Sequence, residues 1–244
     1  MKAHMNALLM VFALAGCATA CTDGPTSPLG NREPAGPGVD RPGPRTGPGV
    51  PFDGTLDQSE ARTPGPTSGW TSTDVVTFAD PSYVVGMSRI KRGPGHASVI
   101  LEASELEPGT AATLWAVVFN NAAACVGECD DPDLFENAAT QADLMYVGGA
   151  IADERGRVRY AGRLGEGATD ASIMPLFGLP AWGVLEASTA EIHLVVRTHG
   201  QAIPGLVSAQ TSTFNGGCTG FGAEFGAPGP NECLEPYYAS HFAN

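Results

Sequence analysis

Short runs of alternating apolar and polar residues, separated by turn residues, recur from Trp70 to the end of the chain, and this pattern most constrains the fold. No stretch of about 10 to 12 residues in this region carries the apolar spacing of a helix. The run Thr113–Phe119 is apolar on both faces, as in a central strand, whereas Glu191–Thr198 is apolar on one face. We therefore predict an all-β fold, a single antiparallel β-sandwich domain.

About eight or nine strands are expected in this domain, with turn residues between them. The runs that favour strands are 98–103, 113–119, 142–151, 155–164, 191–198, 206–214 and 236–242. Asp153 and Glu154 separate the third run from the fourth, and this pattern predicts a hairpin.

The N-terminus has one cation, Lys2, followed by the apolar stretch Ala7–Ala15. This stretch has the length of a signal-peptide core and is too short for a bilayer, which needs roughly 20 apolar residues. It ends on Leu14-Ala15-Gly16-Cys17, which resembles the lipobox of bacterial lipoproteins.

The lipobox resemblance implies a diacylglycerol thioether on Cys17, cleavage before this residue and acylation of the new amino terminus. A plain secretory signal cut after Ala20 is the alternative. Ala18 stands where the family carries an aspartate as its inner-membrane retention signal, so we expect an outer-membrane anchor in a two-membrane bacterium, with the domain periplasmic or surface-exposed. Cys21 then has no local partner, and either a free thiol or an intermolecular disulfide is expected there.

Residues 22–69 differ abruptly from the domain that follows, because ten of these 48 residues are Pro and ten are Gly. Such a segment cannot bury enough apolar surface to offset the entropy lost on ordering, so we predict a disordered Pro/Gly-rich tether. The chain then divides into a signal peptide (1–16), a lipidated N-terminus with linker (17–69) and a β-sandwich domain (70–244).

The domain is strongly acidic, with 8 Lys plus Arg against 20 Asp plus Glu. This charge favours solubility and argues against binding to nucleic acid or to an anionic membrane surface, since both would repel it. The expected contact with the membrane is through the lipid anchor.

Several separated motifs resemble an uncharacterised family of exported bacterial proteins. They are Thr113–Asn121 with the following Cys125 and Cys129, Asp133–Phe135, Ala190–Gly200 and Phe214–Cys218. The similarity runs from about Val85 to His241, and the motifs keep their order. This resemblance implies export and a common fold, and it implies no chemical activity.

Four cysteines lie in the domain, and an even set in an exported chain indicates two disulfides. Three pairings exist. We favour Cys125 with Cys129 and Cys218 with Cys233, because each pair encloses a short loop. A zinc site is the competing interpretation, but Cys-x3-Cys without a nearby histidine matches it poorly.

Two groups of residues could hold a metal ion. His193 lies on the polar face of its strand and His241 ends another, so copper or zinc is one hypothesis. Hydrogen-bonded histidines on a polar face are the alternative. The acidic residues Asp130, Asp131 and Asp133 could bind calcium, although they lack the D-x-D-x-D-G spacing of a known calcium loop.

Four arginines share one face of the predicted strand 155–164, and like charges at this spacing repel unless something lies between them. They are Arg155, Arg157, Arg159 and Arg163. Carboxylates on a neighbouring strand would pair with them. The functional alternative is a binding surface for anionic glycans or phosphates, which guanidinium groups contact with two hydrogen bonds each.

The segment 165–188 breaks the strand rhythm and carries large apolar residues between Gly and Pro. These side chains either fold back to plug an open end of the sandwich, or leave Met174, Phe177 and Trp182 exposed as an apolar binding patch.

Catalytic signatures such as G-x-S-x-G, H-E-x-x-H and G-x-x-x-x-G-K-[ST] do not occur in the sequence. We therefore favour a membrane-anchored structural or interaction module of the cell envelope, with an envelope protein or a glycan as partner. Beyond the lipid on Cys17 no cofactor is expected. A metal-binding β-sandwich and an envelope hydrolase are the alternative hypotheses.

Overall fold

The computed structural model describes residues 69–243, which belong to one compact unit. The predicted signal peptide, Cys17, Cys21 and the predicted tether lie outside the described residues. Within the described part, no helix has both the length and the apolar character needed to cross a membrane.

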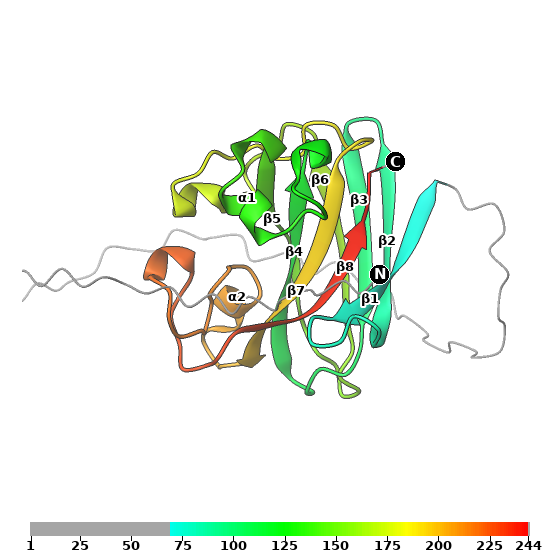
Figure 1. The fold of residues 1–244 in the computed structure, drawn as a ribbon. Helices are drawn as coiled ribbons and strands as arrows, with labels where there is room; N and C mark the ends of the chain where they lie inside the picture. Colours follow the sequence, from blue (N-terminus) through cyan, green and yellow to red (C-terminus); the bar gives the residue numbers. More distant parts are fainter. Residues whose placement is uncertain (1–68, 244) are drawn as a thin grey trace, which may run out of the picture. The chain divides into compact units, whose positions relative to one another are not determined.

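Eight strands form one antiparallel sheet in the order β5-β4-β7-β8-β1-β2-β3-β6. They are β1 (Trp70–Thr77), β2 (Val84–Gly93), β3 (His96–Ala103), β4 (Thr110–Phe119), β5 (Ala142–Ile151), β6 (Val158–Gly165), β7 (Glu191–Gln201) and β8 (Leu234–His241). The sheet curls until it is nearly closed, so that its halves face each other across one core (Figure 1). The prediction of an all-β antiparallel domain is confirmed.

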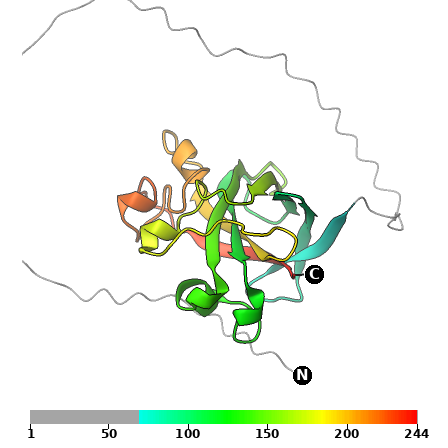
Figure 2. The ribbon, with the colours of Figure 1, turned by 90° about the horizontal axis from the view of Figure 1, so that it is seen from above.

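Short helical segments occupy the connections between the strands. Within residues 69–243 they are η1 (Ala122–Ala124), α1 (Asp131–Phe135), η2 (Ala138–Thr140), η3 (Met174–Phe177), α2 (Val207–Gln210) and η4 (Ala223–Phe225). They gather on the side of β4, β5 and β7, whereas no segment of residues 69–243 covers the outer surfaces of β2 and β3 (Figures 1 and 2).

The inner faces of both halves of the sheet supply the core. Ile90 of β2 and Leu101 of β3 meet Leu114 of β4 and Leu194 of β7, and all four side chains are fully buried. Ile192 and Val196, which flank Leu194 on the same face, are buried with it, as their spacing predicts.

A second apolar cluster lies on the outer side of β4. Trp115 and Phe119 pack there against Leu134 of α1 and Met174 of η3. The doubly apolar pattern of Thr113–Phe119 therefore has the predicted cause, because this strand is buried on both faces.

The predicted hairpin between 142–151 and 155–164 is only partly right: the two runs are joined by a turn and lie side by side, with Gly162 against Val147, but no hydrogen-bonded ladder joins them. These runs form β5 and β6, which stand at the two ends of the sheet order. β6 pairs with β3, and the free edge of β5 is occupied by residues 171–173 instead: the Tyr146 N–H donates to Ala171 O at 2.9 Å and the Ile173 N–H donates to Leu144 O at 3.0 Å. The fourth run also begins later than predicted, at Val158.

The predicted strand 206–214 is wrong too, since this segment forms α2 and the turns after it. Its hydroxyl side chains satisfy local carbonyls: Thr211 Oγ1 donates to Val207 O at 2.9 Å and Ser212 Oγ donates to Ser208 O at 2.6 Å. Such local bonds compete with pairing in a sheet. Conversely, β1 and β2 are strands that the sequence analysis did not name.

Both predicted disulfides are present. Cys125 is bonded to Cys129, with a Cα–Cα distance of 5.1 Å, and Cys218 to Cys233, with a Cα–Cα distance of 5.6 Å. The first closes the loop before α1, and the second ties the long β7–β8 connection to the start of β8.

Candidate functional site

Half of the domain's cations lie on one outer face, formed by β1, β2, β3 and β6. Along β2 the exposed Arg89 and Lys91 alternate with the buried Ile90, and along β6 the exposed Arg159 and Arg163 alternate with buried side chains. This alternation directs all four cations to the solvent side of the sheet. We call this surface the basic face.

The register of the strands places these cations in rows across the sheet. Lys91 pairs with Ser98 and Ser98 pairs with Arg163, so the two cations stand two strands apart, at roughly 10 Å. Along β6, Arg159 and Arg163 are separated by roughly 13 Å. The positive charges therefore form an open array.

Carboxylates partly compensate this array. Arg159 Nε lies 3.2 Å from Glu102 Oε1 on β3, directly across the strand pair, as the structural interpretation of the arginines predicts. Arg163 Nη2 lies 3.0 Å from Nδ1 of His96, which also lies 3.1 Å from Pro94 O. Among residues 69–243, Arg89, Lys91 and Arg163 form no ion pair within 4.0 Å.

The other two arginines predicted for this site lie in the β5–β6 turn. Arg157 is bound to Asp153 at 2.8 Å, and its hydrogen bond lowers the pKa of the Asp153 carboxyl to about 2. Arg155 is exposed, and its N–H donates to Asp153 Oδ1. The structure thus joins two of the four predicted arginines to Arg89 and Lys91, which sequence reasoning missed.

The remaining two cations have structural contacts. Arg92 Nη2 donates to the carbonyls of Ala190 at 2.8 Å and His241 at 3.1 Å, closing the end of β8. Arg197 is buried, and its guanidinium donates to Phe214 O and to Glu235 Oε1, both at 2.7 Å. Burial lowers the pKa of both guanidinium groups, although both stay charged. In the part of the chain that the structure describes, the basic face is therefore where four exposed cations gather.

The two histidines of the copper or zinc hypothesis lie on opposite faces of β7 and β8. His241 points into the core, where Nε2 lies 2.8 Å from Ser88 Oγ. His193 points outward, where Nε2 lies 2.7 Å from Glu191 Oε1. Burial, with Arg92 and His193 nearby, lowers the pKa of His241 to about 4. Each ring has its own hydrogen-bond partner, and the sheet separates the two.

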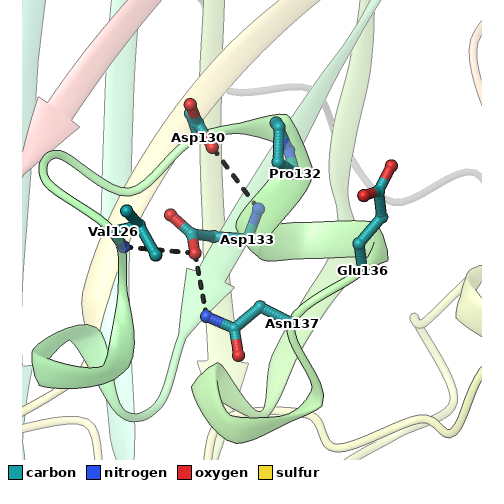
Figure 3. A pocket seen from close by; sticks show the side chains of 6 residues that line it. All are labelled: Val126, Asp130, Pro132, Asp133, Glu136 and Asn137. Carbon is teal, nitrogen blue, oxygen red and sulfur yellow. Dashed lines mark hydrogen bonds between the residues drawn. The ribbon is translucent and has the colours of Figure 1, made fainter.

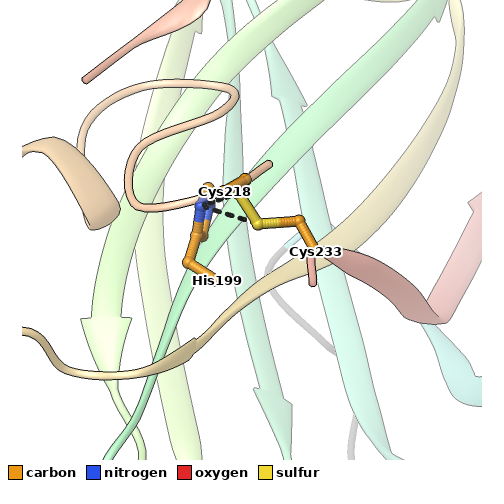
Figure 4. Close-up of side chains that lie close together, drawn as sticks. All are labelled: His199, Cys218 and Cys233. Carbon is orange, nitrogen blue, oxygen red and sulfur yellow. Dashed lines mark hydrogen bonds between the residues drawn. A yellow bond between two sulfur atoms is a disulfide. The ribbon is translucent and has the colours of Figure 1, made fainter. Parts of the chain in front are cut away.

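His199, Cys218 and Cys233 are the one group in the described residues whose His, Cys or carboxylate ligand atoms converge closely enough for a metal (Figure 4). His199 Nδ1 lies 3.3 Å from Cys218 Sγ. The two sulfurs are bonded to each other, however, and a disulfide has no thiolate to offer a metal.

Hydrogen bonds around His199 fix its tautomer and oppose metal binding further. The Gly216 carbonyl can only accept, so His199 Nδ1 carries the proton and donates to it at 2.9 Å. Nε2 then accepts from the Thr113 hydroxyl at 2.8 Å, and Thr113 Oγ1 accepts from the Trp115 Nε1–H at 2.8 Å. This chain of bonds occupies both ring nitrogens, and it anchors the β7–β8 connection to β4.

The long segment 165–188 is buried in two places: its first half packs in the outer cluster on β4, and in its second half Val184 and Ala187 join the inner core, as the plug interpretation predicts. Met174 is buried in the outer cluster, and Phe177 is half-buried among other phenylalanine rings. Trp182 is half-buried, and the N–H groups of Trp182 and Gly183 donate to the buried Asp143 at 2.6 Å. Of the three residues proposed as a patch, Met174 is therefore not accessible.

The three aspartates of the calcium hypothesis lie at the start of α1. Asp130 is the N-cap, and its Oδ1 accepts from the Asp133 N–H at 3.4 Å. Asp131 is exposed in the first turn, whereas Asp133 is buried.

Comparisons of the chain with models of protein families, with curated proteins and with solved structures return no match.

Proposed function

We propose that the chain is a lipid-anchored protein of the cell envelope whose domain binds an acidic glycan through the basic face. The single observation that supports this proposal is the clustering of the exposed Arg89, Lys91, Arg159 and Arg163 on one surface of a strongly acidic domain. Such segregation leaves a region that attracts anions on a protein that otherwise repels them.

The shape of the basic face favours an extended ligand. Its cations stand on a curved sheet surface, roughly 7 to 13 Å apart, and none lines the hollow found elsewhere on the domain. A single phosphate needs donors that converge on one point, whereas a polymer with repeated carboxylate or sulfate groups can contact an open array one charge at a time. Trp70, half-buried at the end of β1 and paired with Lys91, adds an aromatic surface beside the cations.

The test compares two double variants that remove the same charge. In fluorescence anisotropy with labelled heparin at low salt, Lys91→Ala with Arg163→Ala should weaken binding by roughly tenfold or more. Arg155→Ala with Arg157→Ala should change binding little, because these side chains belong to the turn. Equal losses in both doubles, or no heparin binding by the wild type, would overturn the proposal. Tighter binding to single-stranded DNA than to heparin would assign the face to nucleic acid instead.

The anchor is tested separately. Replacing Cys17 by Ser should leave a soluble or unprocessed protein, and the wild-type protein extracted from membranes should have the mass of a chain that begins with an acylated cysteine. A mature chain beginning at Cys21 without lipid would contradict the lipoprotein assignment.

A further inference from the structure

A hollow opens at the start of α1, beside the disulfide loop Cys125–Cys129 (Figure 3). The residues that line it are Val126, Asp130, Pro132, Asp133, Glu136 and Asn137. Three of the six carry carboxylates, and one carries a side-chain amide. The hollow is therefore lined with the oxygen atoms that hard cations prefer.

Asp133 is the unusual member of this group, because its side chain is only 3% exposed. Its Oδ1 accepts from the Asn137 Nδ2–H at 2.9 Å and from the Val126 N–H at 3.4 Å. Its Oδ2 is buried and has no hydrogen-bond partner among the described residues. In Figure 3 this second oxygen points away from Asn137, toward the space between Val126 and Asp130.

A buried carboxylate oxygen without a donor is costly, since burial removes the water that would otherwise solvate its charge. No Lys or Arg lies near Asp133 in the sequence, since residues 93–154 contain none. Within the described residues, none of the carboxylates at 128–136 forms a salt bridge. This region therefore concentrates negative charge around an unsatisfied oxygen.

A bound cation would satisfy the Asp133 Oδ2 and reduce the repulsion between the carboxylates that line the hollow.

We propose that this hollow binds one calcium ion, with the Asp133 Oδ2 and the Asp130 carboxylate as its protein ligands. No three His, Cys, Asp or Glu ligand atoms converge here, because the one such group in residues 69–243 is His199 with Cys218 and Cys233. The ion therefore completes its shell with water and with backbone carbonyls, which calcium accepts. Zinc prefers nitrogen and sulfur ligands, and magnesium demands near-octahedral geometry, so both fit this site less well.

The expected affinity is low. Few carboxylates and several waters resemble the calcium sites of extracellular modules, which have Kd values of about 10⁻⁴ to 10⁻³ M. The inference does not rest on the proposed glycan binding, because the basic face and the hollow share no residue.

Thermal unfolding of the full chain, in EDTA and then in CaCl₂, tests the proposal. At calcium about tenfold above Kd, the Tm should rise by about 3 to 6 °C. Asp133→Asn should abolish this rise and leave the Tm in EDTA equal to or above that of the wild type, because it removes an uncompensated buried charge. Glu154→Gln, which removes an exposed acid in the β5–β6 turn, should keep the full rise.

A wild-type Tm that stays constant up to about 10 mM calcium, or the same rise in Asp133→Asn, would overturn the site, given Kd values near 10⁻³ M. An equal rise with MgCl₂ would overturn the assignment to calcium. If Asp133→Asn does not fold, Asp130→Asn provides the same test, because Asn is as good an N-cap as Asp. Isothermal titration of calcium into the wild type and into this variant should then show binding only in the wild type.

Discussion

The outer surfaces of the two halves of the sheet differ in what lies over them. β4 and β5, the covered half, carry apolar side chains such as Trp115 and Leu144 outward, and the connections 120–141 and 202–233 and the first part of 166–190 are folded against that side (Figure 1). β2, β3 and β6, the bare half, carry Arg89, Lys91, Glu102, Arg159 and Arg163 outward, and no segment of residues 69–243 covers them (Figure 2).

The nature of the outward side chains explains why one half is covered and the other is available for binding. A large apolar side chain left in water costs about 1.5 to 3 kcal/mol relative to burial, so the outward residues of β4 require a cover. The charged residues of the basic face need none, and the connections β1–β2 and β2–β3 are accordingly short. We infer that the long loops mainly stabilise the fold, apart from the proposed calcium site, and that the proposed glycan binding uses the bare half.

The largest effect that tests this comparison is expected at Trp115, on the covered half. Trp115→Ala removes the centre of the outer cluster, where the indole packs edge-on against Tyr146 and Phe214 at ring distances of 5.5 and 5.3 Å. We expect a loss of about 3 to 5 kcal/mol in the free energy of unfolding, measured by urea denaturation. A loss below about 1 kcal/mol would mean that the covering loops contribute little to the fold.

An intermediate effect on the free energy of unfolding is expected when the pH is lowered, because of His199, which lies under the β7–β8 connection. Burial, with a contribution from Arg197, lowers the pKa of His199 to about 4, against about 6.5 in an unfolded chain. Between these two pKa values the unfolded state binds more protons than the folded state. The contribution of His199 to the free energy of unfolding is therefore complete above pH 6.5 and falls as the pH drops toward 4, by about 3 kcal/mol at most.

The replacement His199→Gln should flatten this part of the pH dependence of unfolding, measured by urea denaturation at a series of pH values. His241, also with a pKa of about 4, should still cause its own loss of stability as the pH falls. A wild-type stability that does not change between pH 7 and 4 would contradict both assignments.

The smallest effect is expected on the bare half. Arg159 and Glu102 form an exposed pair, with side chains 61% and 52% accessible, and such pairs contribute at most about 1 kcal/mol. Arg159→Ala should therefore change the free energy of unfolding by less than about 0.5 kcal/mol, whereas heparin binding should weaken measurably. A large loss of stability would show that the basic face is built for the fold.

Local patterns in the sequence determined most of the elements of this protein. The apolar alternation of residues 191–198 and the doubly apolar run 113–119 predicted β7 and β4, because side chains alternate along any strand regardless of its partners. The disulfides followed from cysteines close in sequence, since short loops bring them together.

Only the tertiary structure decided which strands are neighbours, because strand order depends on packing between segments far apart in the sequence. It set β5 and β6 at opposite ends of the sheet order and brought Arg89 and Lys91 of β2 onto one face with Arg159 and Arg163 of β6. It also decided the burial of Asp133, because the residues that pack over a carboxylate in an acidic loop determine whether water solvates it or whether it is buried without a partner.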